Sequence, residues 1–396
     1  MISVEEALPL VLQHTLVLQT EVAPLLQSVG RVLAQDVTAD RDFPPFDRVT
    51  MDGIALRSET FASGTRSFPI EQIQPAGAPQ TILQQAKNCI EVMTGAMLPK
   101  ETDAVVRYED CTLQDGVAVV EIDQILPGQN IHRQGSDKKA GEVLLAAGVK
   151  ITPAIVGTLA SVGLAKVKVY QLPRIAICST GDELVEIGQT PLPHQIRRSN
   201  AYMLAAALLQ ESIKPTLFHL PDEPAQMLQI LGSLLAEHEV LILSGAVSKG
   251  KFDYLPQVLE ELGLKPLFHK VAQKPGKPML FGTFPGPKVV FGLPGNPIST
   301  FVCFHFFFRP WLHASLGLKA EERTAQLTQC ITFKPALTYH VPVKLQVEQG
   351  TLKATPIPST GSGDLTSILE ADGLLSLPAK KGVFLPGESF PLILLS

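Results

Sequence analysis

The chain lacks the short patterns that most often identify a metal or cofactor site. Its five cysteines contain no CxxC pair, which argues against a zinc site or a disulfide framework and favours reduced, mostly buried thiols. The nine histidines show no HExxH spacing. GxSxG, Walker and GxGxxG motifs are also absent. We therefore expect no resident zinc, and any catalytic site must be recognised from other features.

Charge and long apolar runs are also scarce. Charged residues make up 18% of the chain, and the formal net charge of -5 argues against a nucleic-acid partner. The most apolar run, Phe301 to Phe308, is too short to span a bilayer and predicts a buried helix. Glu5 and Glu6 stand where a signal peptide would carry basic residues. We expect a cytoplasmic protein with no membrane partner.

The length of 396 residues predicts two to four domains. Ser3 fits a cap on a helix that runs to about His14, and a second helix is expected over Val22–Ser28. Short apolar stretches between turn residues predict a small β domain from Ile54 to Ile131. Beyond it we expect a helix that opens at Thr152-Pro153 and ends near Ser161, and then a locally paired strand, Lys166–Tyr170.

Between Arg174 and Leu316, apolar strands alternate with longer helical stretches. This alternation predicts a three-layer α/β domain with a mostly parallel sheet. The C-terminal segment has short strands again, which indicates a barrel or sandwich. The predicted domains are a helical and mixed linker domain (1–42 and 139–172), an inserted β domain (43–138), the α/β domain (173–320) and a C-terminal β domain (321–396).

The tract from Lys270 to Pro297 carries the strongest signal of function. Lys274 and Lys277 lie in a turn stiffened by proline and glycine, and the turn Gly292–Pro297 directly precedes a helix. Lysines beside glycine-exposed backbone and a helix start form an anion site. Asn296 fits the N-cap of that helix, and Ser299 lies in its first turn. Two solvated lysines and an ordinary helix cap would also explain the pattern.

Two further glycine-bearing loops follow predicted strands, at Ser179–Glu183 and at Ser244–Tyr254. Ligands of open α/β sheets bind at the carboxyl ends of the strands, so we expect these loops to surround one site. Acidic residues follow the same strands, and Mg²⁺ would let them coexist with a bound phosphate. Each acid could instead be a helix cap, Asp222 above all. Turns at Thr50–Gly53, Met93–Ala96 and Ser359–Asp364 offer further polar groups.

Several longer motifs occur in an order that resembles the molybdopterin molybdenumtransferases, the family of MoeA and the gephyrin E domain. They are PPFDRVTMDGIA, EVMTGAMLP, GQNIHRQGSDKKAGEVLL, STGDEL, SGAVSKGKFDY, KPGKPMLFG and GLPGNP. The resemblance implies a homodimer, an α/β domain similar to the molybdopterin adenylyltransferases, and Mg²⁺-dependent cleavage of adenylylated molybdopterin. That reaction releases AMP and places molybdenum from molybdate on the dithiolene. The molybdopterin adenylyltransferase and molybdoenzyme apoproteins are implied as partners.

The resemblance also implies roles for individual residues. Those implied to act in catalysis are Asp52, Thr94, Asp137, Glu183 and Asp253. Glu183, Asp222 and Asp253 are implied to hold the metal. Those implied to bind substrate are Thr180, Gly181, Asp222, Ser244, Gly245, Ser248, Lys274, Lys277, Pro294, Asn296, Ser299 and Ser362.

The sequence departs from the family pattern at a few positions. Ala246 replaces the second glycine of a usual Gly-Gly-Val-Ser, and Arg198 stands where members commonly have Asp. The stretch ALTYHVPVKL lacks the arginines that members usually carry there, which would weaken bidentate oxyanion binding. Two alternatives to a molybdenum insertase follow. One is a divergent paralogue that binds the pterin nucleotide without inserting molybdenum, or that inserts tungsten. The other is a gephyrin-like scaffold.

Overall fold

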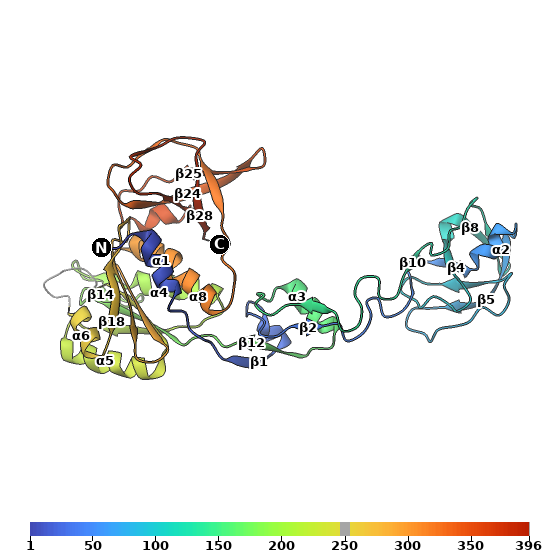
Figure 1. Ribbon diagram of the computed structural model, residues 1–396, viewed down its shortest axis with the longest axis horizontal. Helices are drawn as coiled ribbons and strands as arrows, with labels where there is room; N and C mark the ends of the chain where they lie inside the picture. The colour runs from blue at the N-terminus through green and yellow to red at the C-terminus, as the bar shows by residue number, and fades with distance from the viewer. Residues whose placement is uncertain (246–253, 396) are drawn as a thin grey trace. The chain divides into compact units, whose positions relative to one another are not determined.

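The computed structural model describes residues 1–245 and 254–395, and the chain forms two compact units. The first unit comprises residues 1–34, 148–152 and 166–396, and the second comprises residues 35–147 and 153–165. Each unit is described separately below (Figure 1). The finer division into four domains remains a prediction.

A six-stranded sheet forms the centre of the first unit. Four strands are parallel in the order β16 (Thr216–Leu220), β13 (Ile175–Thr180), β17 (Val240–Ser244) and β21 (Lys288–Leu293). The antiparallel strands β20 (Pro278–Phe284) and β18 (Lys265–Lys270) complete the sheet. The central strands β13 and β17 are buried along their whole length because helices cover both faces, and the predicted three-layer α/β architecture is confirmed.

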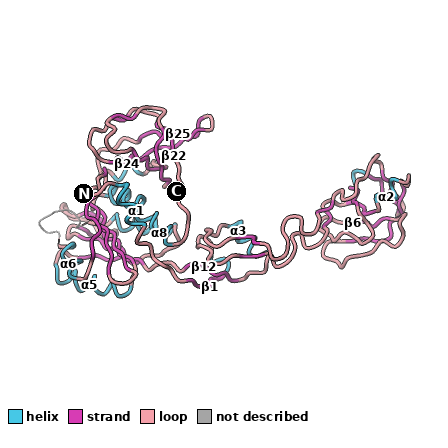
Figure 2. Tube along the Cα trace, in the orientation of Figure 1, coloured by secondary structure: helices cyan, strands magenta, loops and turns pink. Residues whose placement is uncertain are grey.

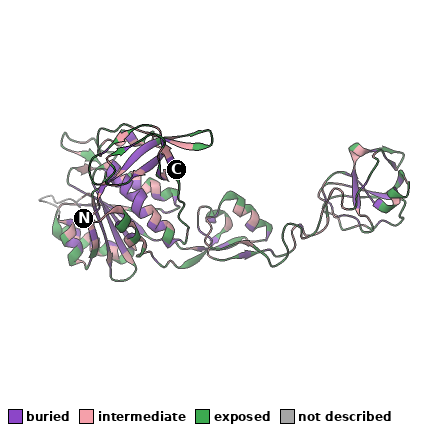
Figure 3. Ribbon diagram, turned by 45° about the horizontal axis from the view of Figure 1, so that its top comes forward, coloured by how far each residue is buried: buried purple, intermediate pink, exposed green. Residues whose placement is uncertain are grey.

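Alternate residues of β13 point into two separate cores. Ile175 and Ile177 pack with α1 (Val4–Leu12), α4 (Ser199–Gln210), α7 (Pro297–Cys303), the π-helix η3 (Phe304–Phe308) and α8 (Arg309–Ser315). Ala176 and Cys178 pack with α5 (Pro224–Glu237) and α6 (Leu255–Glu261) on the other face. This period of two follows from strand geometry. The buried sheet between exposed helix surfaces is visible in Figure 3. The run Phe301–Phe308 is helical and largely buried, as its composition predicts.

The N-terminal prediction is right for the first helix and wrong for the second. Ser3 and Glu6 form a reciprocal capping box at the start of α1. The expected helix Val22–Ser28 is instead strand β1 (Thr20–Pro24), followed by the 3-10 turn η1 (Leu25–Ser28). Strand β12 (Lys166–Tyr170) pairs with β1, Thr20 lying opposite Tyr170, so this strand does not pair locally. A partner so distant in sequence overrides local helical propensity.

The C-terminal strands form the predicted barrel. The strands β24 (Thr338–Glu348), β25 (Thr351–Pro356), β22 (Thr324–Leu327), β28 (Ser389–Leu394) and β26 (Gly373–Leu377) pair in that order, and β26 pairs back to β24. A sixth strand, β19 (Gln273–Lys274), comes from the α/β region and adds to β24 in parallel. A small ladder joins β23 (Ile331–Thr332) to β27 (Val383–Phe384), and the turn η4 (Leu365–Ile368) precedes β26.

The second unit consists mainly of strands and loops (Figure 2). Its sheet has the order β7 (Ala104–Arg107), β4 (Gly53–Leu56), β6 (Cys89–Val92), β5 (Ser67–Gln74), β9 (Val117–Val120) and β8 (Cys111–Gln114). Two short ladders join β2 (Val37–Thr38) to β11 (Val143–Leu145) and β3 (Arg48–Val49) to β10 (Ile131–His132). The helical elements are α2 (Ser58–Ala62), η2 (Tyr108–Asp110) and α3 (Pro153–Ser161), and α3 begins at Pro153 as predicted. The predicted small β region is therefore confirmed as part of the second unit.

No helix in the described part of the chain combines the length and apolar character that a membrane span needs. The five cysteines are free thiols, and all except Cys330 are buried.

Candidate anion-binding site

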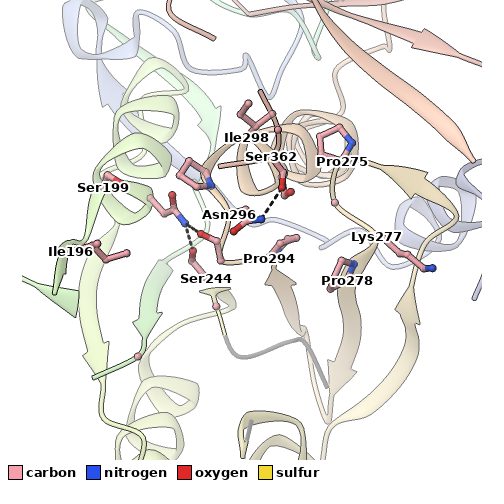
Figure 4. Close-up of a pocket in the computed structure, with 18 of the residues that line it drawn as sticks. Ile196, Ser199, Ser244, Pro275, Lys277, Pro278, Pro294, Asn296, Ile298 and Ser362 are labelled. Atoms are coloured by element: carbon pink, nitrogen blue, oxygen red, sulfur yellow. Dashed lines mark hydrogen bonds between the residues drawn. The ribbon is translucent and has the colours of Figure 1, made fainter. Parts of the chain in front are cut away.

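A cavity of about 1030 Å³ lies in the first unit at the carboxyl ends of β13, β17 and β21 (Figure 4). Each of the three predicted strand-end loops contributes to the cavity wall. The turn of residues 274–277 after β18, called the lysine turn below, also contributes to it. The lining residues that the sequence predicts as site residues are Thr180, Gly181, Glu183, Asp222, Ser244, Gly245, Lys274, Lys277, Pro294, Asn296, Ser299 and Ser362. The parallel sheet brings these loops to one edge.

Close backbone packing sets the shape of the cavity wall. Gly245 has φ +98°, and a Cβ there would lie 2.6 Å from Thr180 Oγ1 and 3.0 Å from the Thr180 carbonyl oxygen. Its N–H donates to the carbonyl of Leu293 at 3.1 Å. Only glycine satisfies both the left-handed backbone and the close approach. Ser248 and Asp253, together with Ala246, lie outside the described residues.

Asn200 of α4 joins two of these loops, and the sequence does not predict it as a site residue. Its Nδ2 donates to the carbonyl of Gly295 at 2.7 Å and to Ser244 Oγ at 3.0 Å. Its Oδ1 is buried and has no hydrogen-bond partner among the described residues. The second position of a helix gives no sequence signal for this role, because the contact depends on the neighbouring strand ends.

Asn296 is the N-cap residue of α7, as predicted, but its side chain makes no capping hydrogen bond. Instead, Nδ2 donates to Ser362 Oγ at 2.7 Å, as Figure 4 shows. The N–H of Ile298 also donates to the Ser362 carbonyl, at 3.1 Å. These two bonds attach the Ser359–Asp364 loop to the first turn of α7, so this loop is part of the cavity wall.

The two lysines have different surroundings. Lys274 Nζ lies 5.6 Å from the ring centroid of Phe333 and 5.9 Å from that of Tyr339, two barrel residues whose rings stack at 4.3 Å. These distances suit a cation–π contact that orients Lys274. Lys277 is exposed, and in Figure 4 its ammonium points away from the Asn296–Ser362 pair.

Basic groups outnumber acidic groups around the cavity. The described lining contains Arg197, Arg198, Lys274 and Lys277 but only two acids, Glu183 and Asp222. Arg198 is 8% exposed and pairs with Glu186, while its buried Nε–H has no partner among the described residues. This balance favours an anionic ligand.

Asp222 is held against a second carboxylate. The N–H of Asp222 donates to Asp182 Oδ1 at 3.2 Å, and the N–H of Asp182 approaches Asp222 Oδ2 at 3.4 Å. Burial raises the pKa of Asp222, and the charges of Asp182 and Glu183 raise it further. Asp222 is not a helix cap, because Glu223 caps α5.

A divalent cation would relieve the repulsion at Asp222. The described residues alone form no cluster of three His, Cys, Asp or Glu side chains that could hold a metal. Glu183 and Asp222 nevertheless line the same cavity, and the third predicted ligand, Asp253, is outside the described residues. The raised pKa at a carboxyl beside two other acids fits a cation site completed by further oxygen ligands.

Three predicted catalytic residues belong to the second unit. Thr94 donates to Asp52 Oδ1 from its N–H at 2.6 Å and from its hydroxyl at 2.7 Å. These bonds, the backbone bond first, lower the pKa of Asp52. Asp137 Oδ1 lies 2.8 Å from His132 Nε2, and His132 Nδ1 lies 3.0 Å from an Arg48 guanidinium nitrogen. The structure thus pairs Asp52 with Thr94 and gives Asp137 a histidine partner.

The fold and the cavity define a class: an α/β protein whose strand-end loops and lysine turn surround a cavity rich in basic groups, which residues of a β barrel also line. Family models cover nearly all of the chain. The MoeA N-terminal region (domain I and II) matches residues 2–163, the probable molybdopterin binding domain matches 176–314, and the MoeA C-terminal region (domain IV) matches 324–395. The chain belongs to the MoeA family, as the motifs predict.

Individual relatives agree with this assignment. A molybdopterin molybdenumtransferase from Synechocystis is 45% identical over 368 residues, which is 92% of each chain. One from Bacillus subtilis is 32% identical and covers 95% of this chain and 90% of its own. Among solved structures, the molybdopterin biosynthesis MoeA protein from Pyrococcus horikoshii has a TM-score of 0.84 at 29% identity, with all of both chains covered.

Proposed function

We propose that this protein inserts molybdenum from molybdate into adenylylated molybdopterin, with Mg²⁺-dependent cleavage of the phosphoanhydride and release of AMP. One observation carries the proposal: three strand-end loops and a lysine turn meet at one cavity of about 1030 Å³ that is rich in basic groups. A cavity of this size suits a nucleotide-sized anionic ligand. The names of the relatives supply the substrate class.

The cavity side chains divide into groups that bind the substrate and groups that would hold the metal ion. Lys274, Lys277 and Ser299 bind the molybdate or phosphate oxyanion. The other predicted substrate contacts, Thr180, Gly181, Ser244, Gly245, Ser248, Pro294, Asn296 and Ser362, shape the pocket for the pterin nucleotide. Glu183 and Asp222, with Asp253, would hold Mg²⁺, which when bound stabilises negative charge as the bond to AMP breaks.

We assign Asp52, Thr94 and Asp137 to catalysis as well. Asp52 is kept ionised by its bonds from Thr94, so it can accept a hydrogen bond from the substrate. Asp137 is oriented by His132. We further propose a cytoplasmic homodimer that receives its substrate from a molybdopterin adenylyltransferase and delivers its product to molybdoenzyme apoproteins.

The test is AMP release from adenylylated molybdopterin in the presence of Mg²⁺ and molybdate. We expect Lys274→Ala to lower kcat/KM by about 100-fold, since a charge-assisted contact to an oxyanion is lost. Lys319→Ala, at an exposed lysine outside the cavity, is the matched control and should retain activity. Absence of molybdate-dependent AMP release by the wild type would contradict the proposal.

The same assay, together with restoration of a molybdoenzyme in a null strain, separates the alternatives. Release that depends on tungstate but not on molybdate would identify a tungsten enzyme. Binding of the pterin nucleotide without release would indicate a non-inserting paralogue. Full activity of Lys274→Ala in restoring a molybdoenzyme in a null strain would remove the lysine turn from the mechanism and favour a scaffold.

A further inference from the structure

The backbone at the start of the lysine turn pairs with a strand of the barrel. Gln273 and Lys274 form β19 and pair in parallel with Thr338 and Tyr339 of β24. The Thr338 N–H also donates to the carbonyl of Ala272 at 3.0 Å. The segment that carries Lys274 is therefore an extra strand of the barrel.

The side chain of Gln273 continues this connection inside the protein. Gln273 is fully buried, and its Nε2 donates to the carbonyl of Gly276 at 2.9 Å and lies 3.4 Å from Cys303 Sγ. Its Oε1 lies 3.1 Å from His340 Nε2. The Gly276 carbonyl can only accept, so the amide nitrogen must face it and the amide oxygen must face His340.

The Gln273 amide therefore determines that Nε2 of His340 carries a hydrogen. Gln273 Oε1 accepts this hydrogen, and the hydroxyl of Ser376 is 3.2 Å from His340 Nδ1 and donates to it. Burial lowers the pKa of His340 to about 3, so the ring is neutral. The ring also lies against Phe306 of the π-helix, with centroids 3.8 Å apart.

The other side of the turn is closed by α7. Gly276 has φ +89°, and a Cβ there would come within 2.5 Å of Cys303 Sγ and 3.4 Å of the Ser299 carbonyl oxygen. The turn is thus held between β24 and the helix that carries Ser299. Side-chain and backbone contacts together fix the four residues from Lys274 to Lys277.

We propose that Gln273 and His340 are positioning residues: the neutral His340 orients the Gln273 amide, which holds the Gly276 carbonyl and so fixes Lys274 and Lys277 for oxyanion binding. The binding role of the lysines rests on the proposed function. Both residues are fully buried and border the cavity, and the polar atoms that link them are bonded to protein groups, so we assign them a positioning role. In this chain, strand β24 thereby supports the anion site through a histidine, although its sequence supplies no arginine from Thr338 to Glu348.

The test compares two replacements at His340 with one at a second buried histidine. His340→Phe keeps a ring but removes both hydrogen bonds, whereas His340→Gln can restore an N–H near the position of Nε2. His305→Phe is the matched control, because His305 is 3% exposed and its ring nitrogens have no partner among the described residues. All three are made in the full chain.

Two readouts are measured: KM for molybdate in AMP release, and hydrogen exchange of the peptide covering 272–278. For His340→Phe we expect about a tenfold rise in KM with a smaller change in kcat, and about tenfold faster exchange. His340→Gln should recover most of both, and His305→Phe should match the wild type.

Exchange in His340→Phe that equals the wild type would overturn the inference, and so would faster exchange with an unchanged KM in an active enzyme. A rise in KM for His305→Phe as large as that for His340→Phe would also count against the inference. A general disturbance of the core would then be enough to explain the rise in both variants. If the wild type releases no AMP, the proposed function fails, and the exchange result alone decides whether His340 holds the turn.

Discussion

Thr94 gives two hydrogen bonds to a single carboxylate oxygen of Asp52, from the backbone at 2.6 Å and from the hydroxyl at 2.7 Å. Because Asp52 is exposed, these bonds, and not burial, determine its titration. They stabilise the ionised form, so the pKa lies below its ordinary value of 3.8. At the residue scale, Thr94 therefore keeps Asp52 charged in acidic solution.

We expect Thr94→Val to raise the pKa of Asp52, since the hydroxyl bond is lost while the backbone bond remains. The lowered pKa in the wild type keeps the carboxylate ionised to lower pH, so the acid limb of the kcat/KM profile should move to higher pH in the variant. Carboxyl NMR titration of Asp52 measures the pKa directly. Thr94→Ser, which retains the hydroxyl, is the control, and an unchanged titration in Thr94→Val would contradict this account.

At the element scale, the two turns that flank β20 contain glycines with similar backbones and different surroundings. Gly276 (φ +89°) lies against Cys303. Gly286 (φ +83°), in the β20–β21 hairpin, has open space around it, since no heavy atom of the described residues lies within 4 Å of where a Cβ would stand. Comparison of the two separates backbone strain from close packing.

We expect Gly286→Ala to cost about 1 kcal/mol of unfolding free energy, the cost of a side chain in the left-handed region. Gly276→Ala should cost about 1–3 kcal/mol more, because its methyl group also overlaps Cys303 Sγ. Chemical denaturation of both variants measures the difference. Equal costs would show that the lysine turn is not tightly held against α7.

Elements with strong local patterns are predictable from the sequence, and those that depend on distant partners are not. The strand Thr216–Leu220 and the capped helix α1 follow from apolar pattern and cap chemistry. The helix predicted over Val22–Ser28 is wrong because its partner strand is β12, at Lys166–Tyr170. Among site residues, Asn200, Gln273 and His340 give no sequence signal, since their roles exist only through contacts across the fold.

At the scale of the whole molecule, Glu211 at the end of α4 connects three segments of the first unit. It pairs with Lys150 at 2.9 Å, with Arg309 of α8 at 3.0 Å and with His313 at 3.1 Å, and its side chain is 5% exposed. Burial acts to raise the pKa of Glu211, but contacts with His313 and Lys150 outweigh it and hold the pKa far below 4.5.

We expect Glu211→Gln to lower the unfolding free energy at pH 7 by about 2–3 kcal/mol, because Lys150 and Arg309 lose their counter-charge. The folded pKa is depressed, so the stabilisation is present above pH 4.5 and declines as the pH falls below that value. The penalty should therefore shrink in acid.

Hydrogen exchange measures the loss of protection in each unit of Glu211→Gln separately. Glu211 and its partners all belong to the first unit, so peptides from residues 35–147 should exchange as in the wild type. A penalty that is independent of pH, or equal loss of protection in both units, would contradict the assignment.

The sequence by itself determined the three-layer α/β region, the two β regions on either side of it in the chain, and the lysine turn as a candidate anion site, because these follow from apolar periodicity and turn chemistry within short windows. Only the tertiary structure decided how Lys274 is held. Its aromatic contacts come from Phe333 and Tyr339, and its turn is fixed through Gln273 by His340. These are contacts between segments far apart in the chain, and their geometry is set by strand pairing and core packing, which local patterns do not encode.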